Sequence, residues 1–405
     1  MIHMQLNSDV LNRVEFLTGN ADLASQLPCV PAMVPFDDRI VSFLNDVSKE
    51  LLKDRASKGF SDVVTFAFWV RKASVIKLKE RFEAKDNALH LGKGVAFHIA
   101  PSNVPVNFAY SLAAGLLNGN ANVVRVPSRD FPQVAMIVTA VNKALETHTE
   151  MKPYVLLVRY GRDREINDLF SSIADIRVVW GGDRTIAELR NSPLPPRSGE
   201  ITFADRYSLA VVDADSYLSM EDKAKVAEDF YNDTFFTDQN ACTSPRVIVW
   251  TGNRIDEAKR VFWEEAHRLV AQKYTFQPIQ GVNKLTSSYL IAAAEPGVKV
   301  QAHEDNLIIR IAVSQISGKL MDYRDNSGYF FEYDCRDILD IRPLCDDKKC
   351  QTIACIGDRQ AVLPLLLSGV KGIDRVVPMG KTMDFDLIWD GYNLPALLTR
   401  TVVME

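Results

Sequence analysis

Residues 95–103 read Val95-Ala96-Phe97-His98-Ile99-Ala100-Pro101-Ser102-Asn103, an apolar run that predicts a strand over 95–99, followed by small and polar residues. Three more short runs rich in β-branched residues follow, at 121–126, 154–158 and 176–180, with longer amphipathic stretches between them. Strands that alternate with helices at this spacing predict an α/β fold with a parallel sheet covered on both faces. Such sheets bind ligands at the carboxyl ends of their strands, so the residues after each run are candidate site residues.

The regions on either side of this alternation have patterns of their own. Apolar residues recur every three or four positions over 37–54 and 66–82, which predicts two helices in an N-terminal helical layer. From residue 207 a second α/β region is expected, with a helix over 221–231 and strands at 208–212, 246–250, 298–301, 307–313 and 352–356. The apolar and aromatic tail is expected to pack back onto the first domain or onto another subunit. The predicted divisions of the chain are 1–90, 91–206, 207–372 and 373–405.

The composition excludes some classes of protein. The chain has 405 residues, of which 47% are hydrophobic and 24% charged, and this is typical of a globular protein with a sizeable core. A net charge of -5 argues against nucleic acid as a partner, because such proteins need a basic face. The apolar runs are too short to span a membrane, and residues 1–9 lack the pattern of an export signal, so we expect a cytoplasmic protein. Six scattered cysteines do not form a disulfide framework.

One cysteine lies in a polar segment between a predicted helix and a predicted strand. The segment reads Asp238-Gln239-Asn240-Ala241-Cys242-Thr243-Ser244-Pro245. A cysteine nucleophile needs thiolate character and access to substrate, and a loop position allows both. On spacing alone, however, an isolated cysteine is more often a small hydrophobic residue of the core.

The candidate ligand residues follow the first, second and fourth strand-like runs. Ser102 and Asn103 precede a predicted helix, where they either contact a phosphate or an oxyanion, or simply cap the helix. After the second run come Arg125, Pro127, Ser128 and Arg129, whose cations either bind a ribose or phosphate or are solvated charges. After the fourth run, Gly181, Gly182 and Asp183 either admit a cofactor close to the backbone or form a plain helix connection.

The order of these segments resembles the aldehyde dehydrogenase superfamily. That superfamily has a Pro-x-Asn-x-Pro motif, matched by Pro101-Ser102-Asn103-Val104-Pro105, then a Pro-Ser strand end, a glycine turn and a cysteine loop. The segment 238–245, the segment 372–380 and the closing Trp389-Asp390-Gly391 look more like the acyl-CoA reductase (LuxC-like fatty-acid reductase) family. The resemblance covers roughly residues 90 to 400. It implies a Rossmann-type cofactor domain at 91–206, a catalytic domain at 207–372 and a C-terminal packing or oligomerisation segment.

The resemblance also implies a mechanism. Cys242 would attack an activated, long-chain acyl group carried by CoA or by a protein, and the Asn103 amide with the Cys242 backbone N–H would stabilise the oxyanion. A nicotinamide cofactor would then reduce the acyl-cysteine thioester to an aldehyde. The implied partners are the acyl-CoA or acyl-protein substrate, an acyl-protein synthetase and further copies of the chain in a homo-oligomer.

Two departures from hydrolytic aldehyde dehydrogenases affect the expected reaction. Those enzymes activate water with a glutamate. The comparable stretch here, 202–208, has no glutamate, and its one acid, Asp205, is left open as a partial substitute for it. The strand end of those enzymes reads Lys-Pro-Ser-Glu, and here Arg129 stands in place of the glutamate. A cation there would attract the ribose 2′-phosphate of NADPH, so NADPH is favoured over NADH. The alternatives are an NAD(P)-dependent aldehyde or semialdehyde dehydrogenase and a non-catalytic subunit of a fatty-acid reductase complex.

The remaining ionisable residues and cysteines of note are expected to be structural. His98 lies within a predicted buried strand, and His303 precedes two acids and is expected to be solvated or structural, with proton donation as the alternative. Cys345, Cys350 and Cys355 do not have the spacing of a zinc site, so no metal is assigned.

Overall fold

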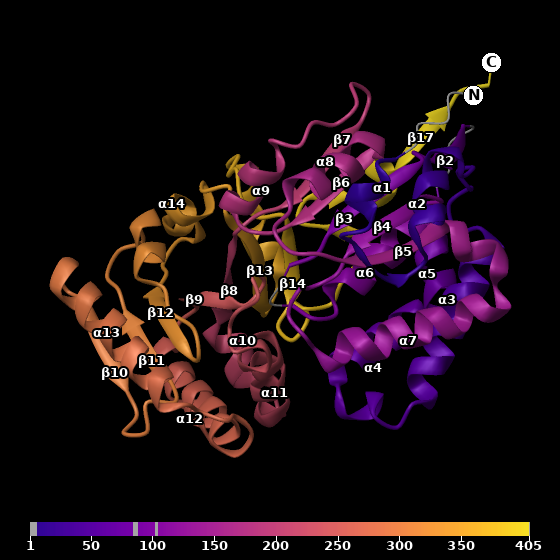
Figure 1. The fold of residues 1–405 in the computed structure, drawn as a ribbon. Coiled ribbons are helices and arrows are strands. Elements are labelled where there is room, and N and C mark those ends of the chain that lie inside the picture. The colour runs from indigo at the N-terminus through magenta and orange to yellow at the C-terminus, as the bar shows by residue number, and fades with distance from the viewer. Residues whose placement is uncertain (1–5, 84–87, 102–103, 405) are drawn as a thin grey trace. The chain divides into compact units, whose positions relative to one another are not determined.

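The computed structural model describes residues 6–83, 88–101 and 104–404, and it divides the chain into two compact units (Figure 1). The first unit comprises residues 1–204 and 386–405, and the second comprises residues 205–385. The predicted helical layer and the predicted cofactor domain are therefore parts of one unit. The tail is divided between the two units, because residues 373–385 stay in the second one.

The first unit is built on a six-stranded sheet in the order β1-β5-β4-β3-β6-β7. Its strands are β1 (Glu15–Thr18), β3 (Val95–Ile99), β4 (Ala121–Arg125), β5 (Val155–Arg159), β6 (Ile176–Trp180) and β7 (Gly199–Phe203). All neighbours are parallel except β1, which runs antiparallel to β5. The first parallel strand, β3, lies between β4 and β6, so the chain order reverses there. This is the doubly wound arrangement whose switch point opens a crevice at the strand ends.

Helices connect these strands and form the N-terminal layer. They are α1 (Ser8–Leu11), α2 (Ala21–Gln26), α3 (Asp38–Lys53), α4 (Ser61–Val70), α5 (Lys72–Phe82), α6 (Asn107–Leu117), α7 (Pro132–Thr147), α8 (Arg164–Ile173) and α9 (Asp183–Leu189). The prediction of one helix over 66–82 was wrong, because Arg71 is extended (ψ 147°) and separates α4 from α5. Two polar side chains stabilise this break: the Asn45 amide oxygen accepts the Lys72 N–H, and the Ser74 hydroxyl donates to Phe68 O.

Residues 386–405 of the C-terminal segment belong to the first unit, which is one of the two packings expected for the tail. It forms β15 (Ile388–Trp389), β16 (Tyr392–Asn393), α16 (Leu394–Leu398) and β17 (Thr399–Val402). In Figure 1 the yellow strand β17 lies beside β2 (Leu89–Gly92), with which it pairs in an antiparallel ladder. The buried side chain of Asn120 also donates to Leu398 O at 2.9 Å, so the tail is fixed to the sheet.

The second unit has a seven-stranded sheet in the order β10-β11-β12-β9-β8-β13-β14. Its strands are β8 (Tyr207–Asp213), β9 (Pro245–Thr251), β10 (Lys299–Ala302), β11 (Ile309–Ala312), β12 (Tyr329–Asp334), β13 (Cys350–Ile356) and β14 (Arg375–Pro378). Its helices are α10 (Ala214–Ser219), α11 (Lys223–Asp233), α12 (Ile255–Lys273), α13 (Pro278–Ala294), α14 (Arg342–Cys345) and α15 (Leu363–Leu367). Only the edge strand β10 runs antiparallel to its neighbour.

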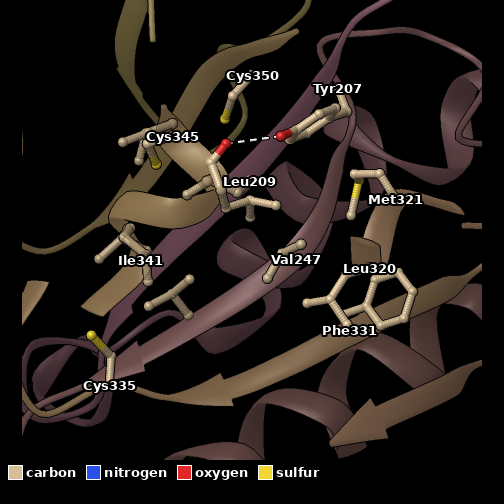
Figure 2. Packing of buried hydrophobic residues seen from close by; sticks show 14 of the residues in the cluster. Tyr207, Leu209, Val247, Leu320, Met321, Phe331, Cys335, Ile341, Cys345 and Cys350 are labelled. Carbon is tan, nitrogen blue, oxygen red and sulfur yellow. Dashed lines mark hydrogen bonds between the residues drawn. The ribbon is translucent and has the colours of Figure 1, made fainter. Parts of the chain in front are cut away.

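Both faces of this sheet are buried. Leu209 and Val247 point to one apolar cluster, whereas their neighbours Ala210 and Ile248 point to the other, as the two-residue period of a strand requires. Figure 2 shows the first cluster, in which the Tyr207 hydroxyl donates to Leu344 O at 2.8 Å. Strands β8 and β9 are therefore rigid supports for the segments that precede them.

In the part of the chain that the structure describes, no helix is both long enough and apolar enough to cross a bilayer.

Candidate active site

The environments of the cysteines separate Cys242 from the others. Cys335, Cys345 and Cys350 lie within the apolar cluster of the second unit (Figure 2), and Cys355 belongs to the same cluster. Burial raises the pKa of Cys335 and of Cys355 to about 12, and that of Cys350 well above its ordinary value. These thiols stay protonated at neutral pH and are poor nucleophiles. Cys242 is only half-buried, and Cys29 is exposed in the first unit.

Cys242 lies in a tightly folded loop between α11 and β9. After the short 3₁₀ turn Phe235–Thr237, Asp238 and Gln239 both adopt the left-handed conformation, with φ of 52° and 57°. The Gln239 N–H donates to Thr234 O at 2.8 Å, which closes the turn. Two consecutive non-glycine residues with left-handed backbone conformation are unusual, so the surrounding contacts must stabilise the turn.

The Gln239 side chain supplies much of that stabilisation. It is fully buried, and its amide nitrogen donates to Pro245 O and Tyr329 O, each at 3.0 Å. Its amide oxygen accepts the backbone N–H groups of Gly328 and Tyr329. One side chain thus joins the beginning of the cysteine loop to its end and to strand β12.

Arg246 and Ser208 hold the other side of the loop. Arg246 is 7% exposed, and its guanidinium donates to Gln239 O at 2.9 Å and to Asp325 O at 2.7 Å. The Ser208 hydroxyl, on β8, donates to the backbone oxygen of Cys242 at 2.8 Å. The backbone of the candidate nucleophile is therefore fixed to the sheet.

A buried lysine orders the segment that Gln239 and Arg246 contact. The Lys284 ammonium donates to Asn306 O, Leu307 O and Ser327 O at 2.6 to 2.9 Å. Burial lowers the pKa of Lys284 to about 8. Gln239, Ser208, Arg246 and Lys284 were not predicted as supporting residues. For the first three, the available signal was a polar residue near Cys242 or at the beginning of an apolar strand, whereas Lys284 lies within helix α13 and has no such signal.

Asp205, considered above as a partial substitute for a water-activating glutamate, is engaged in an ion pair. It is an exposed residue before β8, and its carboxylate accepts from the Arg324 guanidinium at 2.9 Å. In this structure the carboxylate therefore faces a cation.

The predicted cofactor residues lie at one edge of the sheet in the first unit. Strands β4, β3 and β6 are adjacent and parallel, so the residues after Arg125 and after Trp180 share the edge at the switch point. Pro127 is buried at this edge, whereas Ser128, Arg129, Gly182 and Asp183 are exposed and Gly181 is half-buried. Ser102 and Asn103 lie outside the described residues. The helix that follows them, α6, begins at Asn107.

The two arginines of this edge differ in their contacts. The Arg125 guanidinium donates to Tyr160 O and, at 2.9 Å, to Gly161 O, and it lies over the Tyr160 ring. These contacts connect the ends of β4 and β5. Arg129 is exposed, and its guanidinium lies 5.2 Å from the centre of the Phe131 ring.

The environment of His98 confirms its structural role. Its ring nitrogens lie 2.7 Å from Ser111 Oγ and 3.0 Å from Asn122 Oδ1, and burial lowers its pKa to about 4. The ring is therefore neutral at pH 7. His303 stacks on His267 with ring centres 3.9 Å apart, and burial also lowers its pKa. Among the described residues no three His, Cys, Asp or Glu side chains gather as metal ligands would.

The fold defines the class of protein. It is similar to aldehyde dehydrogenase 21 from Physcomitrella patens, with a TM-score of 0.66 and 13% identity over 95% of this chain and 88% of that one. It is also similar to a NAD-dependent benzaldehyde dehydrogenase from Corynebacterium glutamicum, with a TM-score of 0.64 and 15% identity over 98% and 95% of the two chains. The chain therefore has the aldehyde dehydrogenase fold, as predicted.

The sequence places the chain within that class. Residues 76–286, just over half of the chain, match the family acyl-CoA reductase (LuxC), and the protein belongs to this family. It is 23% identical over 297 residues to a long-chain acyl-protein thioester reductase of Photorhabdus laumondii, which covers 71% of this chain and 58% of that protein. It is 26% identical over 176 residues to long-chain acyl-protein thioester reductase 2 of Photobacterium leiognathi, which covers 43% of this chain and 35% of the relative. The chain thus matches between about a third and three fifths of the length of these relatives.

Proposed function

We propose that this protein reduces an activated long-chain acyl group to an aldehyde, with Cys242 as the acyl-accepting nucleophile. One observation carries the proposal: within the matched region, Cys242 is a half-buried thiol on a loop whose backbone is anchored on several sides. A nucleophile must be accessible and held in place, and Cys242 meets both conditions. The buried cysteines of the second unit are held in place but are not accessible.

The reaction begins with attack of the Cys242 sulfur on the carbonyl carbon of the acyl thioester. A new carbon–sulfur bond forms, the carrier thiol leaves, and the acyl group is held as a thioester on Cys242. In this proposal Asn103, which lies outside the described residues, and the Cys242 backbone N–H stabilise the oxyanion. A bound nicotinamide cofactor supplies the hydride for reduction. When the carbon–sulfur bond to Cys242 breaks, the aldehyde leaves and the thiolate is restored.

The first unit has residues that suit such a cofactor. A Cβ added to Gly182 would meet no atom within 4 Å, and the φ of Gly182 is −64°, so neither packing nor backbone geometry demands glycine there. The glycine therefore leaves open space at the end of β6, next to the switch point of the sheet. Arg129 extends from the same edge as an exposed cation, which favours NADPH through its 2′-phosphate over NADH.

The environment of Asp205 favours reduction over hydrolysis. An acyl-cysteine that awaits a hydride must not be attacked by water, and a nearby free carboxylate would promote that attack as a general base. Asp205 is the acid of the stretch 202–208, and its charge is paired with Arg324. The arrangement thus supports a reductase rather than an acid-forming dehydrogenase.

We infer from the same family relation that the acyl group arrives as a thioester on CoA or on a protein. The named relatives are reductases of an acyl-protein thioester, so an acyl-protein synthetase is the expected partner. Their names also indicate a long acyl chain.

The test is acyl transfer to the protein followed by reduction. Incubation with radiolabelled myristoyl-CoA should leave label on the wild type that hydroxylamine removes, because hydroxylamine cleaves thioesters. Cys242→Ala should take up no label, and Cys29→Ala, which removes the exposed thiol of the first unit, should label like the wild type. Addition of NADPH to the labelled wild type should release the label as the C14 aldehyde.

Two results would contradict the proposal. Label that persists on Cys242→Ala would show that another residue accepts the acyl group. Release of myristic acid instead of the aldehyde would show that the acyl-enzyme is hydrolysed.

A further inference from the structure

Arg246 is a buried cation whose hydrogen-bond partners among the described residues are neutral backbone groups. Its guanidinium donates to two backbone oxygens, those of Gln239 and Asp325. In the described part of the chain no carboxylate lies within 4.0 Å of it, and its Nε is buried without a hydrogen-bond partner. A buried charge without a counter-ion is costly, so such a residue is expected to serve an anion that is present in the working protein.

The position of Arg246 relates it to the loop that carries Cys242. Arg246 closes the loop that begins at Gln239, because its guanidinium bonds the Gln239 backbone oxygen across the loop. Cys242 lies between these two residues, and Ser208 fixes its backbone oxygen to the strand next to Arg246. The guanidinium is thus held by the backbone of the loop that carries the thiol.

The charges around Arg246 are consistent with this position. The pKa of Arg246 is lowered to about 10, chiefly by burial and also by the charge of Arg324, while Asp205, Asp325 and Cys242 act in the opposite direction. An attraction between two groups acts on both of them, so a thiolate that favours the charged arginine is itself favoured by it. The carboxylates are engaged elsewhere: Asp205 accepts from Arg324, and Asp325 accepts from the Ser287 hydroxyl.

We propose that Arg246 is a positioning residue that holds Cys242 in its thiolate form while its hydrogen bonds fix the shape of the loop. This inference rests on the proposed function, because it explains how the nucleophile that the proposed reaction requires is activated. The buried cation, rather than a general base, makes the sulfur reactive at neutral pH. The same cation is the counter-ion of the thiolate that returns when the aldehyde leaves.

The alternative is that Arg246 is only a tether of the loop. The two roles can be separated with Arg246→Lys, which keeps the charge and loses the forked hydrogen bonds, and Arg246→Gln, which keeps a planar donor and loses the charge. Arg260→Gln is the matched control, because Arg260 is an exposed arginine of α12 in an ion pair with Glu264.

The experiment measures the rate of iodoacetamide modification of Cys242 in the full protein between pH 5 and pH 10, followed on the peptide that contains it. In the wild type we expect the Cys242 thiol to be half-ionised at a pH below 8.5, which is the ordinary midpoint for a cysteine. Arg246→Gln should raise this midpoint by about one pH unit or more, so that modification at pH 7 slows about tenfold. Arg246→Lys and Arg260→Gln should stay close to the wild type.

A wild-type midpoint at or above that of free cysteine would overturn the proposal, and this measurement needs no variant to fold. Equal midpoints for Arg246→Lys and Arg246→Gln, both above the wild type, would assign Arg246 a tethering role alone. The acylation assay separates this inference from the proposed function. If the wild type takes up myristoyl label but its thiol has an ordinary midpoint, only the role of Arg246 fails. If the midpoint is low and no label is transferred, the proposed reaction fails.

Discussion

Arg125 and Arg129, four positions apart, have different roles at the edge of the first sheet. Arg125 is held by the backbone oxygens of Tyr160 and Gly161, so its guanidinium connects two strand ends. Arg129 is exposed, and its guanidinium lies over the Phe131 ring. Because little of the packing depends on Arg129, its charge can be changed without loss of the fold, and it is the better residue for a test of cofactor choice.

Arg129→Glu should reverse the preference for NADPH. A carboxylate at this position would repel the 2′-phosphate that the guanidinium attracts, and a charge-assisted contact contributes about 1.5–3 kcal/mol, or roughly 10- to 100-fold. The measurement is kcat/KM for aldehyde formation with NADPH and with NADH. Arg129→Gln should have an intermediate ratio, because it removes the attraction without adding repulsion. An unchanged ratio in Arg129→Glu would show that Arg129 does not contact the 2′-phosphate.

For single residues, the sequence predicted which side chains are candidates for a role better than it predicted their burial and their contacts. His98 was expected to be structural because it lies within an apolar strand, and its burial between Ser111 and Asn122 confirms this. By spacing alone Cys242 could not be distinguished from a cysteine of the core. Arg246 and Lys284 were not predicted as supporting residues. The carbonyl groups that Lys284 bonds lie more than 20 positions away in the chain, and Asp325, whose carbonyl group Arg246 bonds, lies 79 positions away. Such contacts follow from the fold and have no local signature.

At the element scale, Asp233 attaches the turn after β14 to the end of α11. Its buried carboxylate accepts the N–H groups of Gly380 at 2.6 Å and Thr382 at 3.0 Å. The turn needs a glycine, because Gly380 has φ of 85° and an added Cβ would lie 2.6 Å from the Asp229 carboxylate. The family-like segment that ends at Gly380 is thus a structural attachment within the second unit.

This attachment should make stability depend on pH. Burial raises the pKa of Asp233 from 3.8 to about 6, although both N–H donors lower it. Between these values the folded protein holds a proton that the unfolded chain has lost, so stability falls as the pH rises through this window. Asp233→Asn does not titrate. Its free energy of unfolding relative to the wild type should therefore increase by about 2 kcal/mol between pH 4 and pH 7, as measured by urea denaturation. A difference that is the same at both pH values would contradict the assignment.

Elements were predicted best where the pattern was long or the strand was central. The predicted strand at 95–99 matches β3 residue for residue, and the predicted helix at 37–54 differs from α3 by one residue at each end. The helix predicted over 66–82 was wrong, because the bonds that separate α4 from α5 come from Asn45 and Ser74 rather than from a proline or glycine. The edge strand β2 was also missed. Its partner β17 lies about 300 positions away, and a four-residue strand has little pattern of its own.

At the scale of the whole molecule, the chain leaves the first unit after residue 204 and returns to it at residue 386. The apolar tail predicts this return, but its pattern does not show which residues of the first unit it contacts. The structure assigns this role to β2 and to Asn120, which is fully buried. The Asn120 amide nitrogen donates to Leu398 O and to Gly115 O, and its oxygen accepts the Gly94 N–H. One amide therefore joins the tail, the end of α6 and the beginning of β3.

Asn120→Asp should release the tail from the first unit. A carboxylate cannot donate, so it would face the Leu398 and Gly115 backbone oxygens as a buried, unpaired charge, at a cost of about 3–5 kcal/mol. Asn120→Ala loses the same hydrogen bonds without adding a charge and should cost about 1–3 kcal/mol. The first measurement is the free energy of unfolding of the two variants. The second is hydrogen exchange, which should accelerate most in residues 89–92 and 399–402, because their ladder depends on the attached tail. If both variants retain wild-type protection in these two strands, the strand pairing holds the tail without help from Asn120, and the assigned role of this residue is wrong.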